Sequence, residues 1–208
     1  VSIRQDTGDT LRYTVTGADA DRTLYSLKDG KLSISATENS ILNFGGHRGA
    51  ELTVLVPDGW MPRELSVESI SAPIRIENLN GTELDVDTVS GVIELTDIRA
   101  DELSLSTISA KITCSGAARD VSLETTSGNC ALELTERPEK IDLESVSGDL
   151  ELFLPKKAGF TLRLDTVSGK FRTDLDYSTP KGDTYLSGDG GCAIRAETVS
   201  GNVDIRQK

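Results

Sequence analysis

The sequence predicts an all-β protein: a parallel β-solenoid of about seven coils, each of roughly 20 residues, with an N-terminal β cap. A Thr/Ser-x-Ser-Gly/Ala motif recurs along the chain, its spacing is nearly constant, and the apolar residues around it fall in fixed columns. The central serine of the motif is found at Ser71, Ser90, Ser109, Ser127, Ser147, Ser168 and Ser200, with successive intervals of 19, 19, 18, 20, 21 and 32 residues.

Each repeat alternates between apolar and polar residues on both sides of the serine, which is typical of two short strands. The positions six and four residues before the serine are always apolar, as with Leu84 and Val86. The position immediately before the serine is also apolar in most repeats, as with Val89. If that residue faces the core, the alternation slips by one residue, so we expect a bend or bulge at this corner.

Small and hydroxylated residues form the corner. The residue after the serine is glycine in five repeats and alanine at Ala72 and Ala110, which favours close backbone approach over a positive φ angle. Two residues before the serine a hydroxyl is always present, and we expect it to bond to the neighbouring coil's backbone. A nucleophilic role for the serines is disfavoured, because the single histidine, His47, lies outside the repeats. We expect His47 and Arg48 to be solvated loop residues, not an anion site.

Composition narrows the class of protein. Of the 208 residues, 37% are hydrophobic but only 4% are aromatic, which suits a solenoid core of valine, isoleucine and leucine. The net charge of -12 argues against nucleic acid or an anionic membrane as a partner. No apolar run is long enough to span a bilayer. The chain begins at Val1 without a methionine, which leaves room for a targeting segment or membrane tether outside it.

The three cysteines do not suggest a disulfide framework. Cys114 and Cys130 fall in different apolar columns of adjacent coils, so we expect two buried free thiols. Cys192 lies in a less regular stretch, and we expect it to be more exposed.

The two ends of the repeat array differ from its middle. Residues 1–60 read as less regular strands, with a hairpin signal at Asp29-Gly30, and we expect them to form a cap continuous with the solenoid of residues 61–208 in one structural domain. The long last interval contains residues 177–191, expected to form a projecting loop or short hairpin. Protruding loops of solenoids often bind ligands. Its candidate binding residues are Tyr177, Lys181, Asp183, Tyr185 and Asp189.

A column of acids lies three residues before the serine. If the coils stack in sequence order, Glu124, Glu144 and Asp165 lie roughly 5 Å apart and repel one another. A divalent cation, most plausibly calcium, would relieve this repulsion. The alternative is a solvated outer face that discourages edge association.

The Thr-Val-Ser-Gly-x-Ile-x-Leu units, the segment Leu52-Thr-Val-Leu-Val-Pro57 and the closing stretch 188–205 resemble the bacterial putative-adhesin β-strand-repeat family, domain of unknown function 4097 (DUF4097). The resemblance extends from about residue 24 to residue 205. It implies a β-solenoid in proteins of the bacterial cell envelope, often beside a membrane segment, with some relatives linked to envelope stress. It brings no catalytic motif.

We therefore expect a non-enzymatic, adhesin-like scaffold or recognition module, extracytoplasmic or anchored at the cell envelope, that binds a protein or glycan. Two alternatives remain open: a self-assembling cytoplasmic solenoid and a polysaccharide-active β-helix enzyme. The enzyme is disfavoured because the acids follow the repeat, whereas a catalytic site would interrupt it.

Overall fold

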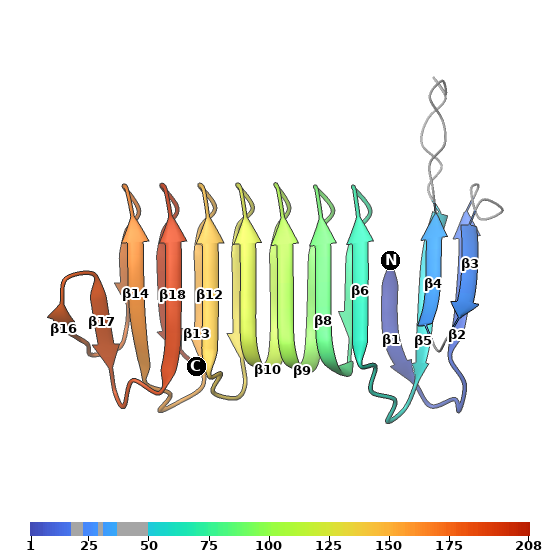
Figure 1. Ribbon diagram of the computed structural model, residues 1–208, viewed down its shortest axis with the longest axis horizontal. Coiled ribbons are helices and arrows are strands. Elements are labelled where there is room, and N and C mark those ends of the chain that lie inside the picture. The colour runs from blue at the N-terminus through green and yellow to red at the C-terminus, as the bar shows by residue number, and fades with distance from the viewer. Residues whose placement is uncertain (18–22, 29–30, 37–49) are drawn as a thin grey trace, which may run out of the picture. The chain divides into compact units, whose positions relative to one another are not determined.

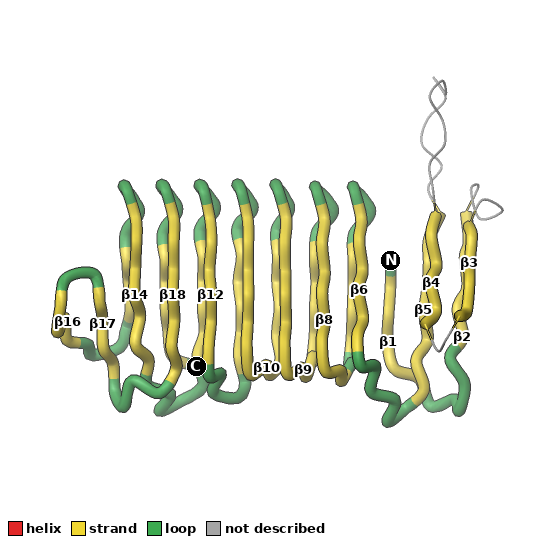
Figure 2. Tube along the Cα trace, in the orientation of Figure 1, coloured by secondary structure: helices red, strands yellow, loops and turns green. Residues whose placement is uncertain are grey.

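The computed structural model describes residues 1–17, 23–28, 31–36 and 50–208, and every regular element in these residues is a β-strand (Figures 1 and 2). The chain forms two compact units, residues 1–58 and residues 59–208. The predicted all-β class is confirmed.

The first unit contains β1 (Ser2–Asp6), β2 (Arg12–Gly17), β3 (Thr23–Lys28), β4 (Lys31–Ala36) and β5 (Ala50–Pro57). Strand β5 pairs parallel with β1 and antiparallel with β2, and β3 and β4 form the hairpin expected around Asp29-Gly30. The two turn residues lie outside the described part of the chain, as do His47 and Arg48. Capping of the solenoid by this unit stays a prediction.

The second unit is built mostly from parallel strands. These are β6 (Glu64–Ser69), β7 (Ile74–Glu77), β8 (Asn80–Thr88), β9 (Ile93–Thr107), β10 (Ile112–Thr125), β11 (Cys130–Leu134), β12 (Lys140–Ser145), β13 (Leu150–Leu154), β14 (Phe160–Thr166), β15 (Phe171–Thr173), β16 (Ser178–Lys181), β17 (Thr184–Ser187), β18 (Cys192–Thr198) and β19 (Val203–Gln207). Strand β17 is antiparallel to β14 and β16. Strands β9 and β10 are long because each passes from one sheet into the other.

These strands form two parallel ladders. The upstream sheet, whose strands lead into the corner serines, has the order β6, β8, β9, β10, β12, β18, β14. The downstream sheet, whose strands follow the serines, has the order β7, β9, β10, β11, β13, β19, β15. Their inward residues form the core, and the columns expected to be apolar, such as Leu84, Val86 and Ile93, are buried.

The coils do not stack in sequence order. Strand β18 of the last coil lies between β12 and β14, as Figure 1 shows, and β19 lies between β13 and β15. The in-order stacking assumed from the sequence is therefore wrong. Strand β17 pairs antiparallel with one edge of β14, so the returning chain finds only the other edge of β14 open to a parallel strand.

The corner differs from the expectation in its phase. The hydroxyl column is buried in five of the seven coils, as at Thr125 and Ser145, and the aliphatic residues immediately before the serines are exposed. The alternation continues to the hydroxyl residue and its phase changes after it, because Thr125 and Gly128, three residues apart, are both buried on either side of a bend at residues 126–127. The expected bend at the corner is therefore present, but the aliphatic residue lies outside the core. In the pairing of β9 with β10 a further register shift lies between Cys114 and Gly116. The hydroxyls can be buried because their oxygens accept a local hydrogen bond, as from Gly128 N to Thr125 Oγ1 at 2.8 Å.

The serines make the bonds between coils. Both the backbone N–H and the hydroxyl of Ser127 donate to the carbonyl oxygen of Ile108, at 2.9 and 3.3 Å. Ser147 repeats this arrangement on Thr126, and Ser168 on Val199. The predicted structural role of these serines is confirmed, whereas the bond between coils comes from the serine and not from the hydroxyl two residues earlier.

Close approach explains the glycine after the serine, as predicted. A Cβ atom on Gly148 would lie 2.0 Å from the carbonyl oxygen of Gly128, and one on Gly201 would lie 2.1 Å from that of Gly148. Neither glycine has a positive φ angle. The stacked backbones leave no room for a side chain.

All three cysteines are buried free thiols. This confirms the expectation for Cys114 and Cys130 but not for Cys192, whose strand lies inside the stack. Burial raises the pKa of each thiol to about 12, so these groups are poor nucleophiles at neutral pH.

The corner contact predicts a large effect of one methyl group. Gly148→Ala is expected to lower the free energy of unfolding by about 1–3 kcal/mol, because the backbone of Gly128 in the neighbouring coil blocks the added carbon. Urea denaturation followed by circular dichroism measures this change. Gly8→Ala is the control, because its Cβ would meet only side-chain ends, those of Arg12 at 3.0 Å and Asp6 at 3.2 Å. Equal stability of the two variants would contradict the close-contact explanation.

Because the last coil is inserted between earlier coils, removing it is expected to destabilise strands that remain in the truncated chain. Deleting residues 192–208 takes away the strand between β12 and β14, so amide protons of β14 to β17 are expected to lose protection in hydrogen exchange, while those of β9 and β10 stay protected. A chain lacking only residues 207–208 is the control. Retained protection of β14 would show that it can take the vacated position beside β12.

Candidate functional site

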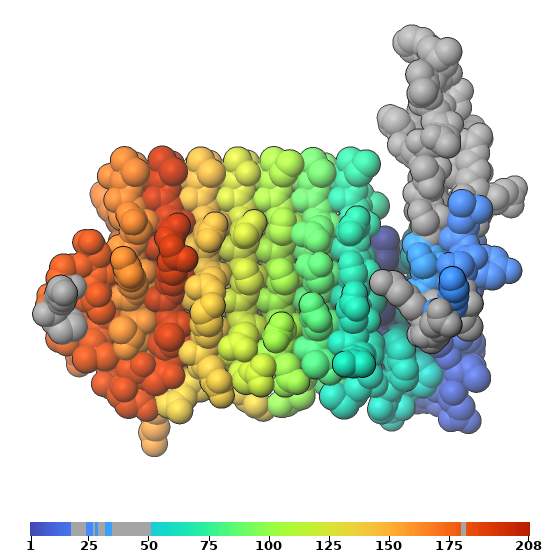
Figure 3. Space-filling model, viewed as in Figure 1, coloured from blue at the N-terminus to red at the C-terminus, as the bar shows by residue number. Residues whose placement is uncertain are grey.

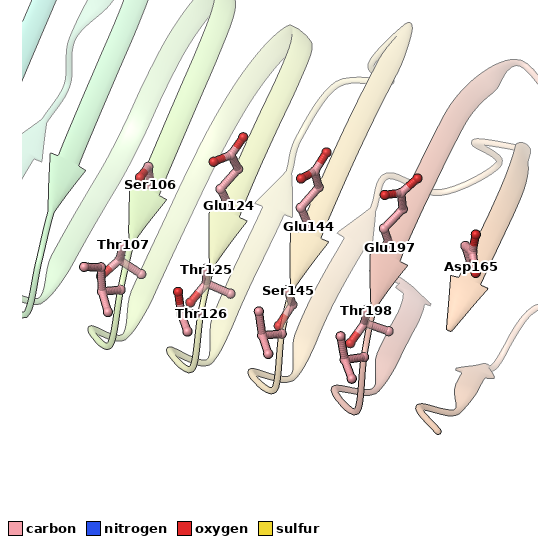
Figure 4. Close-up of a pocket in the computed structure, with 13 residues that line it drawn as sticks. Ser106, Thr107, Glu124, Thr125, Thr126, Glu144, Ser145, Asp165, Glu197 and Thr198 are labelled. Carbon is pink, nitrogen blue, oxygen red and sulfur yellow. The ribbon is translucent and has the colours of Figure 1, made fainter. Parts of the chain in front are cut away.

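The outer face of the upstream sheet carries a row of acids near the corners. We call this the acid row: Glu68, Asp87, Glu124, Glu144, Glu197 and Asp165 in stacking order, with Ser106 between Asp87 and Glu124. Figure 4 shows the carboxylates of Glu124, Glu144 and Glu197 side by side, with Asp165 beyond Glu197. The expected adjacency of Glu144 and Asp165 is wrong, because Glu197 of the inserted strand separates them.

A second row lies beside the first, two residues further along the chain, in the bend that follows each upstream strand. We call this the aliphatic row: Ile70, Val89, Ile108, Val146, Val199 and Val167, with Thr126 between Ile108 and Val146. The exposed fractions of its aliphatic members range from 42% for Val89 to 81% for Val167. In the sequence this row is a column of apolar residues, which predicts a core position, whereas the structure places the column on the surface.

The two rows share a shallow groove. A depression of about 550 Å³ extends over β9, β10, β12, β18 and β14, and both rows line it together with the hydroxyl residues between them. Its residues come from strands that are far apart in sequence and neighbours in the sheet. The space-filling view in Figure 3 shows these strands as closely packed parallel ridges.

Few cations neutralise the acid row. In the described part of the chain, Glu197 pairs with Arg195 of its own strand, and no ion pair engages Glu124 or Glu144. Lys140 and Asp142 form another pair on this face, with 2.5 Å between Nζ and Oδ2. The centre of the groove therefore carries unpaired negative charge.

Metal binding by Glu124, Glu144 and Asp165 stays a prediction. The described residues contain no group of three or more acidic, histidine or cysteine side chains placed to hold an ion. Any cation at this row would meet Glu197 between Glu144 and Asp165.

Crowding of acids also affects Asp85, on the same face. Partial burial raises the pKa of this carboxyl group, and the charges of Asp87, Glu83 and Glu68 raise it further against a hydrogen bond with Ser104. The folded state therefore disfavours the ionised form of Asp85.

The expected binding loop is a hairpin of β16 and β17, and β17 extends the upstream sheet beyond β14. Tyr177 and Tyr185 pack against Phe171, with ring centroids 5.7 and 4.6 Å away. The backbone carbonyl of Asp183 accepts a bond from Leu164 N, and the side chain of Lys181 is not described.

Asp189, after this hairpin, anchors the chain. It pairs with Arg137 at 2.8 Å and accepts a bond from Gly191 N at 3.0 Å. The Gly191 N–H and the Arg137 charge lower its pKa. Binding by the hairpin stays a prediction, but Asp189 and the tyrosine rings contribute to closing the end of the stack.

Fold and surface together define a parallel β-solenoid whose exposed rows repeat from coil to coil. The chain belongs to the Toastrack family, DUF4097, whose model matches residues 1–136 and 115–206. This confirms the resemblance drawn from the corner motifs.

One solved structure similar to the chain is a crystal structure titled "putative cell adhesion protein", from Clostridium sporogenes. It is 12% identical, with a TM-score of 0.46, and the match covers 100% of this chain and 87% of that chain. No curated protein matches the sequence. Among the described residues, no helix is long and apolar enough to cross a membrane.

Because the pKa of Asp85 is raised, Asp85→Asn is expected to increase the melting temperature by an amount that depends on pH. The stability associated with the protonated carboxyl is complete below the unfolded-state pKa, about 3.9, and is lost as the pH rises through the higher folded-state value. The variant is therefore expected to melt at a higher temperature than the parent at pH 7, and at the same temperature at pH 3. Thermal melts at both pH values measure this difference. Asp9→Asn, in a turn of the first unit, is the control; a gain of equal size at pH 3 would contradict the electrostatic explanation.

Proposed function

We propose that the protein is a non-enzymatic recognition module of the bacterial cell envelope that binds a protein partner through the outer face of its upstream sheet. The observation that carries this proposal is the aliphatic row. Single exposed apolar residues are common on protein surfaces, but a contiguous series of them marks an interaction surface. This row recurs at the same position of successive coils, beside acids.

The rest of the unit supports a scaffold role. Six corner serines, from Ser90 onward, each donate twice to a neighbouring coil. The hydroxyl column is buried in five of the seven coils, and a closely packed aliphatic core lies between the sheets. Such ladders hold the outer rows at fixed spacing. A preformed surface loses little conformational freedom on binding.

The serine and cysteine side chains are engaged in structural contacts. The serine hydroxyls donate to neighbouring carbonyls, and the thiols are buried with a pKa of about 12. Glycoside hydrolysis uses paired carboxylates instead. The polysaccharide-active alternative is disfavoured because the acids of the acid row recur from coil to coil, whereas a catalytic site would interrupt the repeat. A glycan ligand is also less well supported than a protein, because exposed aromatic platforms are absent from the groove lining.

The end of the stack argues against open-ended assembly. A solenoid that polymerises coil on coil needs a free parallel edge, and β14 instead has the antiparallel β17 on its outer side. The seven corner motifs and the separate unit of residues 1–58 support the finer description of seven coils with an N-terminal cap. We place the protein outside the cytoplasm on the family resemblance.

The test is capture of protein from a bacterial envelope extract by the immobilised chain. Val146→Asp with Val199→Asp places two charges on adjacent coils of the aliphatic row and is expected to abolish capture. The matched control, Thr113→Asp with Ala131→Asp, places the same charges on adjacent coils of the downstream sheet and is expected to retain it.

Three results would contradict the proposal: equal capture by both variants, capture that survives protease treatment of the extract, or turnover of a polysaccharide by the purified chain. Circular dichroism of each variant verifies that the fold is intact.

A further inference from the structure

We propose, resting on the recognition function above, that the groove binds a basic amphipathic α-helix of a partner protein, lying along the stack of coils. The two rows give the chemistry of this partner. The aliphatic row requires an apolar stripe, and the acid row requires lysine or arginine beside it.

The aliphatic row is confined to one outward position. The other outward positions of the same strands carry polar or charged residues, as at Asp142 and Glu144 before Val146. Valine and isoleucine suit any strand, but that preference would apply equally at those other positions. Thr126 shows that the position accepts a hydroxyl without altering the sheet register. The row is thus a feature of the surface that the fold does not require.

Charge selects among apolar partners. Glu124 and Glu144 have no ion pair within the described chain, and Arg195 engages only Glu197. In a symmetric contact, a second copy of this protein would bring its acid row against the acid row or against the aliphatic row, on a chain with a net charge of -12. The first arrangement places like charges together, and the second buries carboxylates against apolar side chains. An anionic membrane meets the same repulsion. A segment that is both basic and apolar is attracted by the charges of the acid row and buries apolar surface against the aliphatic row.

Spacing selects the helix. Adjacent coils lie about 4.8 Å apart. A helix repeats a face about every 5.4 Å, so across four coils the mismatch grows to only about 2 Å, within the reach of flexible side chains. An extended strand repeats a face about every 6.7 Å, and over the same four coils the mismatch reaches about 6 Å. A helix of three to four turns therefore matches the rows best.

The geometry within one coil agrees with this choice. The acid lies near the end of an upstream strand and the aliphatic residue of the same coil lies two residues on, in the bend that follows, so the two are at most roughly 6.7 Å apart. A helix of about 10 Å diameter covers both rows at once. Its apolar stripe then lies on residues such as Val146 and Val199, with its basic stripe over Glu124 and Glu144.

The probe is a synthetic 18-residue helical peptide of leucine, lysine and alanine, with one leucine stripe and one adjacent lysine stripe. Fluorescence anisotropy measures its affinity for the full chain at 50 and 150 mM salt. Two peptides serve as controls: one of the same composition with the stripes scrambled, and one with glutamate in place of lysine. The striped basic peptide is expected to bind at least about tenfold more tightly than either.

Variants of the chain locate the binding. Val146→Thr with Val199→Thr keeps the side-chain shape. It is expected to lower the affinity for the striped peptide about tenfold without changing the salt dependence of that affinity. Glu124→Gln with Glu144→Gln is expected to lower the affinity for the striped peptide at 50 mM salt. The difference in affinity between 50 and 150 mM salt is then expected to be smaller than for the parent. Glu77→Gln with Asp176→Asn removes the same charge elsewhere and is expected to bind as the parent does.

Three outcomes would overturn the helix proposal: equal binding of the scrambled peptide, no effect of the valine substitutions, or binding of phosphatidylglycerol vesicles that the same substitutions abolish. If no peptide binds but envelope protein is still captured through Val146 and Val199, the helix is wrong and the recognition function stands. If capture fails as well, both are wrong.

Discussion

The structure depends on one repeated contact, in which a corner serine donates its N–H and its hydroxyl to a carbonyl oxygen of the neighbouring coil. At Gly128 and Gly148 the two backbones approach so closely that a side chain on the residue after the serine has no space. Ser109 makes the same two bonds to Val89 with Ala110 after it, so the contact itself does not require glycine. The serine contact also fixes the register of each coil on the next. Every column of the sequence therefore becomes a row in space.

This constraint explains which parts of the fold could be predicted. Apolar columns predict both that a segment is a strand and which of its faces points inward. Leu84 pairs with Leu103, and Val86 with Leu105, as their columns predict. The orientation of Val89 and Val146 could not be read in the same way. Periodicity indicates alternation, but it does not say that the buried member at the corner is a hydroxyl residue whose oxygen is satisfied locally, as Thr88 is by Gly91 N.

Coil order was not predictable for a related reason. The coils share one pattern, so β12 offers β14 and β18 nearly equivalent partners, and pairing energies between columns do not distinguish them. The hairpin of β16 and β17 distinguishes the two orders, because β17 occupies the outer edge of β14. Only the inner edge of β14, the one that faces β12, is then left for the returning strand β18. The acid row consequently gained Glu197 between two residues that the sequence placed together.

The residues that the fold requires are thus distinct from the residues that form its outer surface. The core and the corners use the inward positions, and nothing in that framework requires Glu144 or Val146 outside. Like charges at coil spacing oppose folding, and exposed aliphatic residues favour association. On the same face, Asp85 has a raised pKa chiefly because it is partly buried, and the charge of Asp87 raises it further. Features that oppose local stability while leaving the framework intact occur where a protein meets a partner. A partner that supplies positive charge and apolar surface together would relieve both costs, and a rigid ladder presents them at a spacing that the partner can match.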